Sequence, residues 1–182
     1  LRSYVGKGAD ALVHRALTGS LAGRADAALF EPAVVAFRRH YAHENGARSR
    51  FYPGVLKGLV ALRAKGLKLA CVTNKPMAFT EPLLDRTGLR AHFDLVLGGD
   101  SLPRKKPDPD QLLHACAHFC VSPQEALMIG DSVHDAHAAR AAGMPVLAVP
   151  YGYNEGQDVD TLDVDAIVGS IDQASQLITC IA

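Results

Sequence analysis

From Phe51 onward the chain alternates short apolar stretches with amphipathic ones, and this alternation constrains its fold more than any other feature. The apolar stretches are typical of strands and lie at residues 67–72, 94–98, 126–130, 146–149 and 166–168. The amphipathic stretches have helical spacing and lie at residues 55–63, 76–87, 109–120, 133–142 and 172–181. Strands that alternate with helices of this length form right-handed βαβ units and a parallel sheet. The pattern therefore predicts an α/β fold with a Rossmann-like parallel sheet.

Residues 1–50 have a different pattern, because their apolar side chains recur only at helical spacing and no β-branched run interrupts them. Pro32 is expected in the first turn of the second helix, where its missing N–H is not needed. We therefore predict two domains: a small helical domain at residues 1–50 and an α/β core at residues 51–182.

Composition narrows the possible partners. Lys+Arg and Asp+Glu number 19 each, so no overall positive field attracts nucleic acid. No apolar run approaches the ~20 residues that a membrane-spanning helix needs. None of the cysteines forms a C-x-x-C pair, which favours reduced thiols in a cytoplasmic protein; they are Cys71, Cys116, Cys120 and Cys180. We expect a cytoplasmic monomer or homodimer that binds neither nucleic acid nor membrane.

Polar side chains follow three of the predicted strands. Thr73 and Asn74 come after the first, Lys106 lies in the loop after the second, and Asp131 comes after the third with Asp135 one helical turn later. In an open α/β sheet, ligands bind at the carboxyl ends of the strands. The sequence therefore predicts that these five side chains converge on one edge of the sheet.

Their chemistry suits a phosphate group and a cation. A hydroxyl and an amide can donate hydrogen bonds to phosphate oxygens, and a lysine neutralises their charge. Asp131 is an oxygen ligand of the kind that Mg²⁺ prefers, and Asp135 is placed to hold Lys106 or a metal-bound water. Taken singly, a Thr-Asn turn or a Gly-Asp-Ser helix cap is ordinary local structure. Together they predict phosphoryl transfer by positioning and charge neutralisation.

Three of these stretches resemble sequence motifs of a known family. VTNK at 72–75, KKPDP at 105–109 and IGDSVHD at 129–135 are similar to the second, third and fourth motifs of the haloacid dehalogenase (HAD) superfamily of phosphohydrolases. VGKGADALVHRAL at 5–17 and YGYNEG at 151–156 resemble its phosphoglycolate phosphatase branch. The resemblance covers essentially the whole chain, with the motifs in the family's order.

The resemblance implies a role for each candidate residue. Thr73 would bind the transferring phosphoryl group with help from Asn74, and Lys106 would stabilise its charge. Asp131 would be a Mg²⁺ ligand, and Asp135 would support Lys106 or the metal shell. The implied reaction is Mg²⁺-dependent hydrolysis of a small phosphomonoester, 2-phosphoglycolate above all, through an aspartyl-phosphate intermediate.

The resemblance also implies that residues 1–50 are a helical cap that closes over the site. The candidate substrate-binding cations in this cap are Lys7 and Arg15. A two-carbon substrate with both a carboxylate and a phosphate would gain from a cation opposite its phosphate end. We expect Lys7, in the flexible GKG stretch, to bind the substrate.

One family motif, the D-x-D-G-T stretch that supplies the nucleophile and the general acid/base, does not occur in the chain. We therefore expect the nucleophile upstream of Leu1, on a strand between the strands that end at Thr73 and Gly130. Residues 1–182 alone are expected to be inactive. Two alternatives remain open: a phosphomutase or other sugar-phosphate phosphatase of the same superfamily, and a catalytically dead phosphate-binding module.

Overall fold

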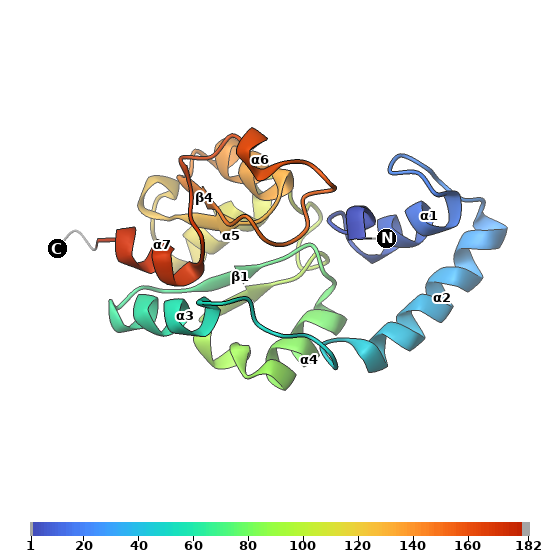
Figure 1. Ribbon diagram of the computed structural model, residues 1–182, viewed down its shortest axis with the longest axis horizontal. Helices are drawn as coiled ribbons and strands as arrows, with labels where there is room; N and C mark the ends of the chain where they lie inside the picture. The colour runs from blue at the N-terminus through green and yellow to red at the C-terminus, as the bar shows by residue number, and fades with distance from the viewer. Residues whose placement is uncertain (1, 180–182) are drawn as a thin grey trace.

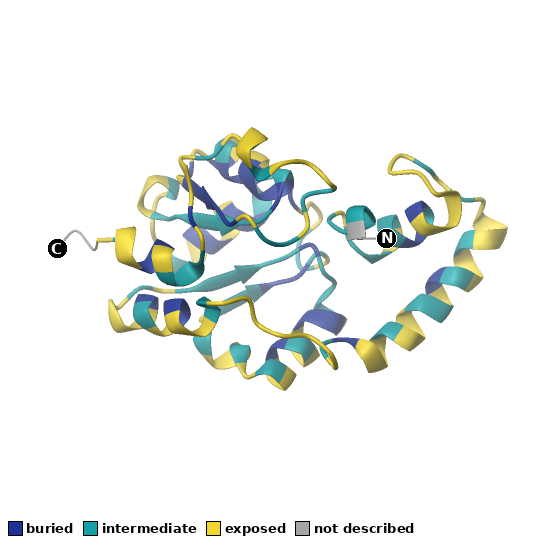
Figure 2. Ribbon diagram, viewed as in Figure 1, coloured by how far each residue is buried: buried dark blue, intermediate teal, exposed yellow. Residues whose placement is uncertain are grey.

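The computed structural model describes residues 2–179, and its first part is helical. A short 3₁₀ helix at Arg2–Tyr4 precedes α1 (Ala9–Thr18) and α2 (Ala27–Glu44). These two helices extend from one end of the remaining elements, and α2 is exposed or half-buried along most of its length (Figures 1 and 2).

The prediction for Pro32 was wrong, because α2 begins five residues earlier and Pro32 lies inside it. The helix starts at Ala27, and the Phe30 N–H donates to the Asp26 carbonyl at 2.8 Å. The stretch Ala27–Leu29 consists of strong helix formers, so the helix extends back past the proline.

The remaining elements alternate as predicted. They are α3 (Val55–Ala64), β1 (Ala70–Val72), α4 (Met77–Thr87), β2 (Leu95–Leu97), α5 (Asp110–Phe119), β3 (Met128–Gly130), α6 (Val133–Ala142), β4 (Val146–Ala148), β5 (Ala166–Ile167) and α7 (Ile171–Leu177). Three further 3₁₀ helices lie at Leu89–His92, Pro123–Glu125 and Val159–Thr161. The last helix ends at Leu177, short of the predicted residue 181, and residues 180–182 lie outside the described part.

All described strand pairs are parallel, and they form two separate sheets. One has the order β1-β2, with Cys71 opposite Val96. The other has the order β3-β4-β5, with Ile129 opposite Leu147. β1 and β3 are not paired with each other, as the sequence predicted. Each of these two strands therefore has one edge without a strand partner within residues 2–179.

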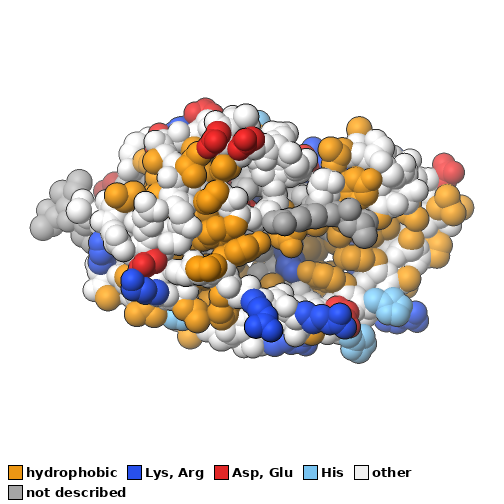
Figure 3. Space-filling model, in the orientation of Figure 1, with side chains coloured by type: hydrophobic (Ala, Val, Ile, Leu, Met, Phe, Trp, Pro, Cys, Tyr) orange, Lys and Arg blue, Asp and Glu red, His pale blue; other side chains and the backbone are white. Residues whose placement is uncertain are grey.

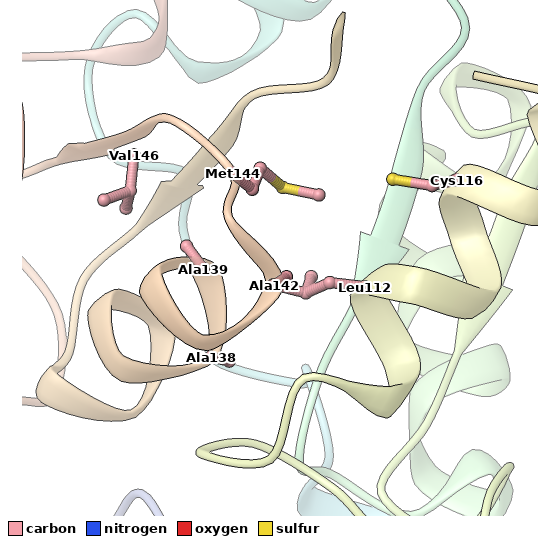
Figure 4. Close-up of a cluster of buried hydrophobic side chains, with 7 residues drawn as sticks. All are labelled: Leu112, Cys116, Ala138, Ala139, Ala142, Met144 and Val146. Atoms are coloured by element: carbon pink, nitrogen blue, oxygen red, sulfur yellow. The ribbon is translucent and has the colours of Figure 1, made fainter. Parts of the chain in front are cut away.

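A buried apolar cluster joins α5 and α6 to the strands (Figure 4). Ala138 and Ala139 are completely buried and carry the smallest apolar side chains, so α6 can approach the sheet closely. Leu112 and Cys116 reach the same cluster from α5, and Val146 reaches it from β4. This packing holds α6 against the strands, and the polar residues after β3 lie at the start of that helix.

An apolar hollow of about 250 Å³ lies beside β3. Its lining includes Tyr52, Ile129, Val149 and Tyr151, and the Tyr52 and Tyr151 rings stack with centroids 4.3 Å apart. Hydrophobic side chains also form a band across the face shown in Figure 3. Apolar groups therefore remain open at the carboxyl end of β3, next to Asp131.

Among residues 2–179, no helix combines the length and the apolar character needed to cross a membrane. Cys71, Cys116 and Cys120 are free thiols, and Cys180 lies outside the described residues.

Candidate active site

The centre of the candidate site is a buried ion pair between Lys106 and Asp135. Lys106 Nζ lies 2.6 Å from Asp135 Oδ1, and the two side chains are only 8% and 6% exposed. The same ammonium group also donates to the carbonyl of Val72, the last residue of β1, at 2.6 Å. A lysine held on two sides in this way presents its charge at the carboxyl end of β1, next to Thr73.

Asp135 uses its second carboxylate oxygen to organise the start of α6. Its Oδ2 accepts hydrogen bonds from the Asp131 N–H at 3.1 Å, the Ser132 N–H at 3.1 Å and the Ser132 hydroxyl at 2.8 Å. Ser132 is the N-cap and forms a capping box with Asp135. Gly130 is required beside it, because a Cβ at that position would lie 2.3 Å from the Asp135 Cβ.

Asp131 stands just before this cap and does not cap the helix itself. Its Oδ2 accepts a hydrogen bond from the Tyr153 N–H at 2.8 Å. Burial, together with the nearby charge of Asp135, raises the pKa of Asp131 to about 6. The carboxylate form of Asp131 is therefore destabilised, and a cation beside it would remove that penalty.

Asp135 titrates in the opposite direction. Its burial acts to raise the pKa, but the charge and hydrogen bond of Lys106, together with the hydrogen bonds from Ser132 and the Asp131 N–H, outweigh it, and the net pKa is below the ordinary value. Asp135 is thus a buried anion that Lys106 already neutralises. Asp131, by contrast, forms no salt bridge with any cation within residues 2–179. This difference makes Asp131 the candidate for binding an external cation.

The residues after β1 hold the surrounding loops. The Thr73 N–H donates to Leu97 O at 2.9 Å, and its hydroxyl oxygen accepts from the Lys75 N–H at 3.2 Å. The hydroxyl still has its own hydrogen to donate. The Asn74 side-chain amide donates to the carbonyls of Gly6 and Lys106, at 3.0 and 2.9 Å, while its buried Oδ1 has no partner within the described chain. Asn74 therefore ties the N-terminal loop to the Lys106 loop.

The neighbouring cations differ in their surroundings. Lys7 and Lys105 are exposed, and the Lys105 ammonium lies beside Gly8. Arg15 is buried and paired with Glu155, with Arg15 Nη1 2.7 Å from Glu155 Oε1. Lys7 is thus available at the surface, whereas the charge of Arg15 is already paired with the carboxylate of Glu155.

Sequence reasoning missed a second contact between the helices and the core. Lys75 Nζ donates to the Tyr41 hydroxyl and, at 3.0 Å, to Asn45 Oδ1. Asn45 is buried at the end of α2 and donates to the Phe79 carbonyl at 2.6 Å. The signal available in the sequence was the position of Lys75 in the VTNK stretch, directly after Asn74. The partners of Lys75 could not be predicted, because they are about thirty residues away in sequence.

The donor set fits Mg²⁺, which usually takes one or two carboxylates and completes its shell with water and substrate phosphate oxygens. Asp131 supplies one suitable carboxylate. Within residues 2–179 no three His, Cys, Asp or Glu side chains converge as a metal site. The described chain thus offers an open, carboxylate-anchored position and not a closed structural cage.

The fold and the site define a hydrolase class. Residues 17–149 match the model of the haloacid dehalogenase-like hydrolase family, and the chain belongs to that family. It is 54% identical over 178 residues to a phosphoglycolate phosphatase of Nitrosospira multiformis, which covers 98% of this chain and 78% of that protein. It is 50% identical over 179 residues to a phosphoglycolate phosphatase of Thiobacillus denitrificans, covering 98% and 79%.

A solved structure agrees with these relatives. The crystal structure of a predicted phosphoglycolate phosphatase from Haemophilus somnus 129pt superposes with a TM-score of 0.90 at 33% identity. The match covers 97% of this chain and 80% of that one. The α/β fold with parallel strands predicted from the sequence is therefore confirmed.

Proposed function

We propose that the protein is a cytoplasmic phosphatase that hydrolyses 2-phosphoglycolate to glycolate and phosphate with Mg²⁺, as a monomer or homodimer. The proposed substrate rests on the 54% and 50% identity, over 98% of the chain, to two phosphoglycolate phosphatases. The Lys106–Asp135 pair beside Thr73 and Asp131 supports the reaction class.

Each residue has a part in this proposal. Lys106 neutralises charge on the transferring phosphoryl group, and the Thr73 hydroxyl donates to a phosphoryl oxygen. Asp135 holds the Lys106 ammonium in position. Asp131 binds Mg²⁺, which when bound neutralises phosphate charge as a Lewis acid. Asn74 assists by fixing the Lys106 loop.

Residues 1–50 form the cap domain in this proposal and residues 51–182 the core. Lys7 lies on the N-terminal loop that Asn74 anchors through Gly6. Its exposed ammonium is available to attract the substrate carboxylate, which supports its role in substrate binding.

We further propose that the nucleophilic aspartate is carried by a segment preceding Leu1. The support is the pair of unpartnered edges on β1 and β3 and the apolar hollow beside β3. A strand placed there would end beside Lys106 and Asp131, because parallel strands share one carboxyl edge.

The test is an assay of the full-length protein on a panel of 2-phosphoglycolate and hexose phosphates, with Mg²⁺ or with excess chelator. We expect 2-phosphoglycolate to be preferred and the chelator to abolish turnover. Residues 1–182 alone, assayed in parallel, should show no turnover. Equal rates with and without the chelator would contradict the metal's role, and a preference for hexose phosphates would contradict the substrate.

Gly152 offers a separate test of Asp131. A Cβ at Gly152 would lie 1.9 Å from Asp131 Oδ2. Gly152→Ala should therefore displace the carboxylate and lower kcat/KM by about 10- to 100-fold, the range typical for disturbing the surroundings of a metal ligand. The measurement is kcat/KM together with the Mg²⁺ concentration at half-maximal activity.

Gly156→Ala is the matched control for this variant. Gly156 also has a positive φ of +83°, but the nearest atom to its Cβ would be 3.9 Å away. Alanine is therefore strained by the backbone at both positions, but it meets a clash only at Gly152. Equal activity losses in the two variants would mean that strain alone, and not displacement of Asp131, is responsible.

A further inference from the structure

Glu155 and Arg15 form a buried ion pair between two parts of the chain that are distant in sequence. Their closest atoms are 2.7 Å apart, and the side chains are 4% exposed for Arg15 and 11% for Glu155. Arg15 belongs to α1, whereas Glu155 lies in the loop that follows β4. Removing one partner of a pair buried this deeply leaves the other charge without compensation.

Both partners are held rigidly. The Arg15 guanidinium also donates to the carbonyls of Leu21 and Tyr4, each at 2.9 Å, which fixes its plane. Glu155 has a φ of +52°, a left-handed conformation that is uncommon for a residue with a side chain. Such a conformation persists only where the surroundings determine it, and the Glu155 side chain lies in buried surroundings here.

The same loop also contacts the candidate metal ligand. The Tyr153 N–H donates to Asp131 Oδ2 at 2.8 Å, and Asn154 Oδ1 accepts from the Val133 N–H at 2.8 Å. Three consecutive residues, 153–155, thus bind Asp131, the first turn of α6 and Arg15 of α1. An open pocket of about 490 Å³ has both Asp131 and Glu155 in its lining.

The N-terminal loop packs directly on this junction. A Cβ on Gly6 would lie 3.6 Å from both Glu155 Cγ and His134 Cδ2. His134 Nε2 lies 3.5 Å from Glu155 Oε1. The carboxylate of Glu155 is therefore enclosed by α1, the N-terminal loop and α6 together.

We propose that the Arg15–Glu155 pair is a clasp that couples the position of α1 to the orientation of Asp131. Glu155 and Arg15 are positioning residues, since they act through the 153–155 backbone. This inference rests on the proposed function for its kinetic consequences. Its physical basis, the link from α1 to the Asp131 loop, is independent of which substrate is used.

The test uses the full-length enzyme with Glu155→Ala, Arg15→Met and the double variant. Each single change should raise KM and the Mg²⁺ concentration for half-maximal activity by about 10-fold, within the range for residues that support a metal ligand, with a smaller change in kcat. The double variant should be no worse than either single one, because it leaves no unpaired buried charge. Glu155→Gln keeps the side-chain shape and replaces Glu155→Ala if that variant does not fold.

Asp10→Ala is the matched control. Asp10 of α1 forms an ion pair with Arg38 of α2 at 2.8 Å. This pair is on the surface, with the Asp10 side chain 59% exposed and the Arg38 side chain 54% exposed. Exposed pairs contribute little, so this variant should behave like the wild type.

A second readout does not depend on turnover. Without substrate, the amides of residues 4–21 should exchange hydrogen faster in Glu155→Ala than in the wild type or Asp10→Ala, and Mn²⁺ should bind several-fold more weakly. Unchanged exchange and unchanged Mn²⁺ affinity would overturn the clasp. If the wild type hydrolysed no phosphomonoester, the proposed function would fail, while exchange and Mn²⁺ binding would still decide the clasp.

Discussion

Replacing Lys106 by alanine is expected to lower kcat on 2-phosphoglycolate by roughly 100- to 1000-fold, the range seen when a charge-stabilising donor is removed from an active site. The structure gives the reason: the ammonium is buried and fixed by Val72 O and Asp135 Oδ1 at the carboxyl end of β1. Steady-state kinetics of the full-length enzyme with Mg²⁺ measure the effect.

Two further variants separate chemistry from folding. Lys105→Ala is the matched control, because the adjacent Lys105 is exposed and should leave kcat near the wild-type value. Lys106→Ala alone leaves Asp135 as an unpaired buried charge, which destabilises the fold. Adding Asp135→Asn removes that charge and keeps an oxygen that can accept from the N–H groups of Asp131 and Ser132. The double variant should melt at a higher temperature than Lys106→Ala and remain inactive; recovered activity would refute the role of Lys106.

Asp131→Asn is expected to lower kcat/KM by at least about 100-fold at physiological Mg²⁺ and to raise the Mg²⁺ requirement. An amide oxygen can still accept the Tyr153 N–H, so the loop after β4 stays anchored. The change therefore removes the negative charge while keeping the local hydrogen bond. Titration of activity against Mg²⁺ concentration measures the effect.

The pKa of Asp131 also predicts how the stability of the metal-free protein changes with pH. The pKa of Asp131 is raised to about 6 in the folded protein from its ordinary value of 3.8, so the folded state holds its proton longer. In metal-free buffer its contribution to the free energy of unfolding therefore falls as pH rises from about 4 to 6 and stays reduced above that. At pH 7 without metal, Asp131→Asn should melt at the same or a higher temperature than the wild type.

Asp163→Asn serves as the control for Asp131. Asp163 is 74% exposed and pairs with Arg140 of α6, so its loss should change neither activity nor melting temperature appreciably. If Asp131→Asn retained normal activity and Mg²⁺ dependence, Asp131 would not be a metal ligand.

The sequence predicted the core elements well because each has a strong local signal. The strand at 126–130 contains β3 (Met128–Gly130), and the helix at 133–142 matches α6. Gly88 and Gly143 adopt the left-handed conformation that ends α4 and α6, so both helices end at the residues where the sequence pattern predicted. The start of α2 was misplaced because a proline inside a helix resembles one in a first turn.

For the candidate site, chain order predicted which residues gather but not what each one contacts. Thr73, Lys106 and Asp131 follow successive strands, and Lys106 links the end of β1 to the start of α6 through Val72 O and Asp135 Oδ1. Sequence spacing left open whether Asp135 would hold Lys106 or a metal-bound water, and the structure gives a 2.6 Å ion pair to Lys106. Asn74 was expected to help bind phosphate, yet its amide hydrogens bind the Gly6 and Lys106 carbonyls.

The sequence by itself determined the α/β class, the order of the elements and the residues at the sheet edge, because these follow from hydrophobic period and local turn chemistry. Only the tertiary structure decided that Arg15 is buried against Glu155 and that Lys75 binds Tyr41 and Asn45. These partners are separated by 30 to 140 residues, so no local pattern encodes them. A cation on a helix is usually a surface group, and it is the packing of the N-terminal loop over Glu155 that excludes water and turns Arg15 into an internal partner.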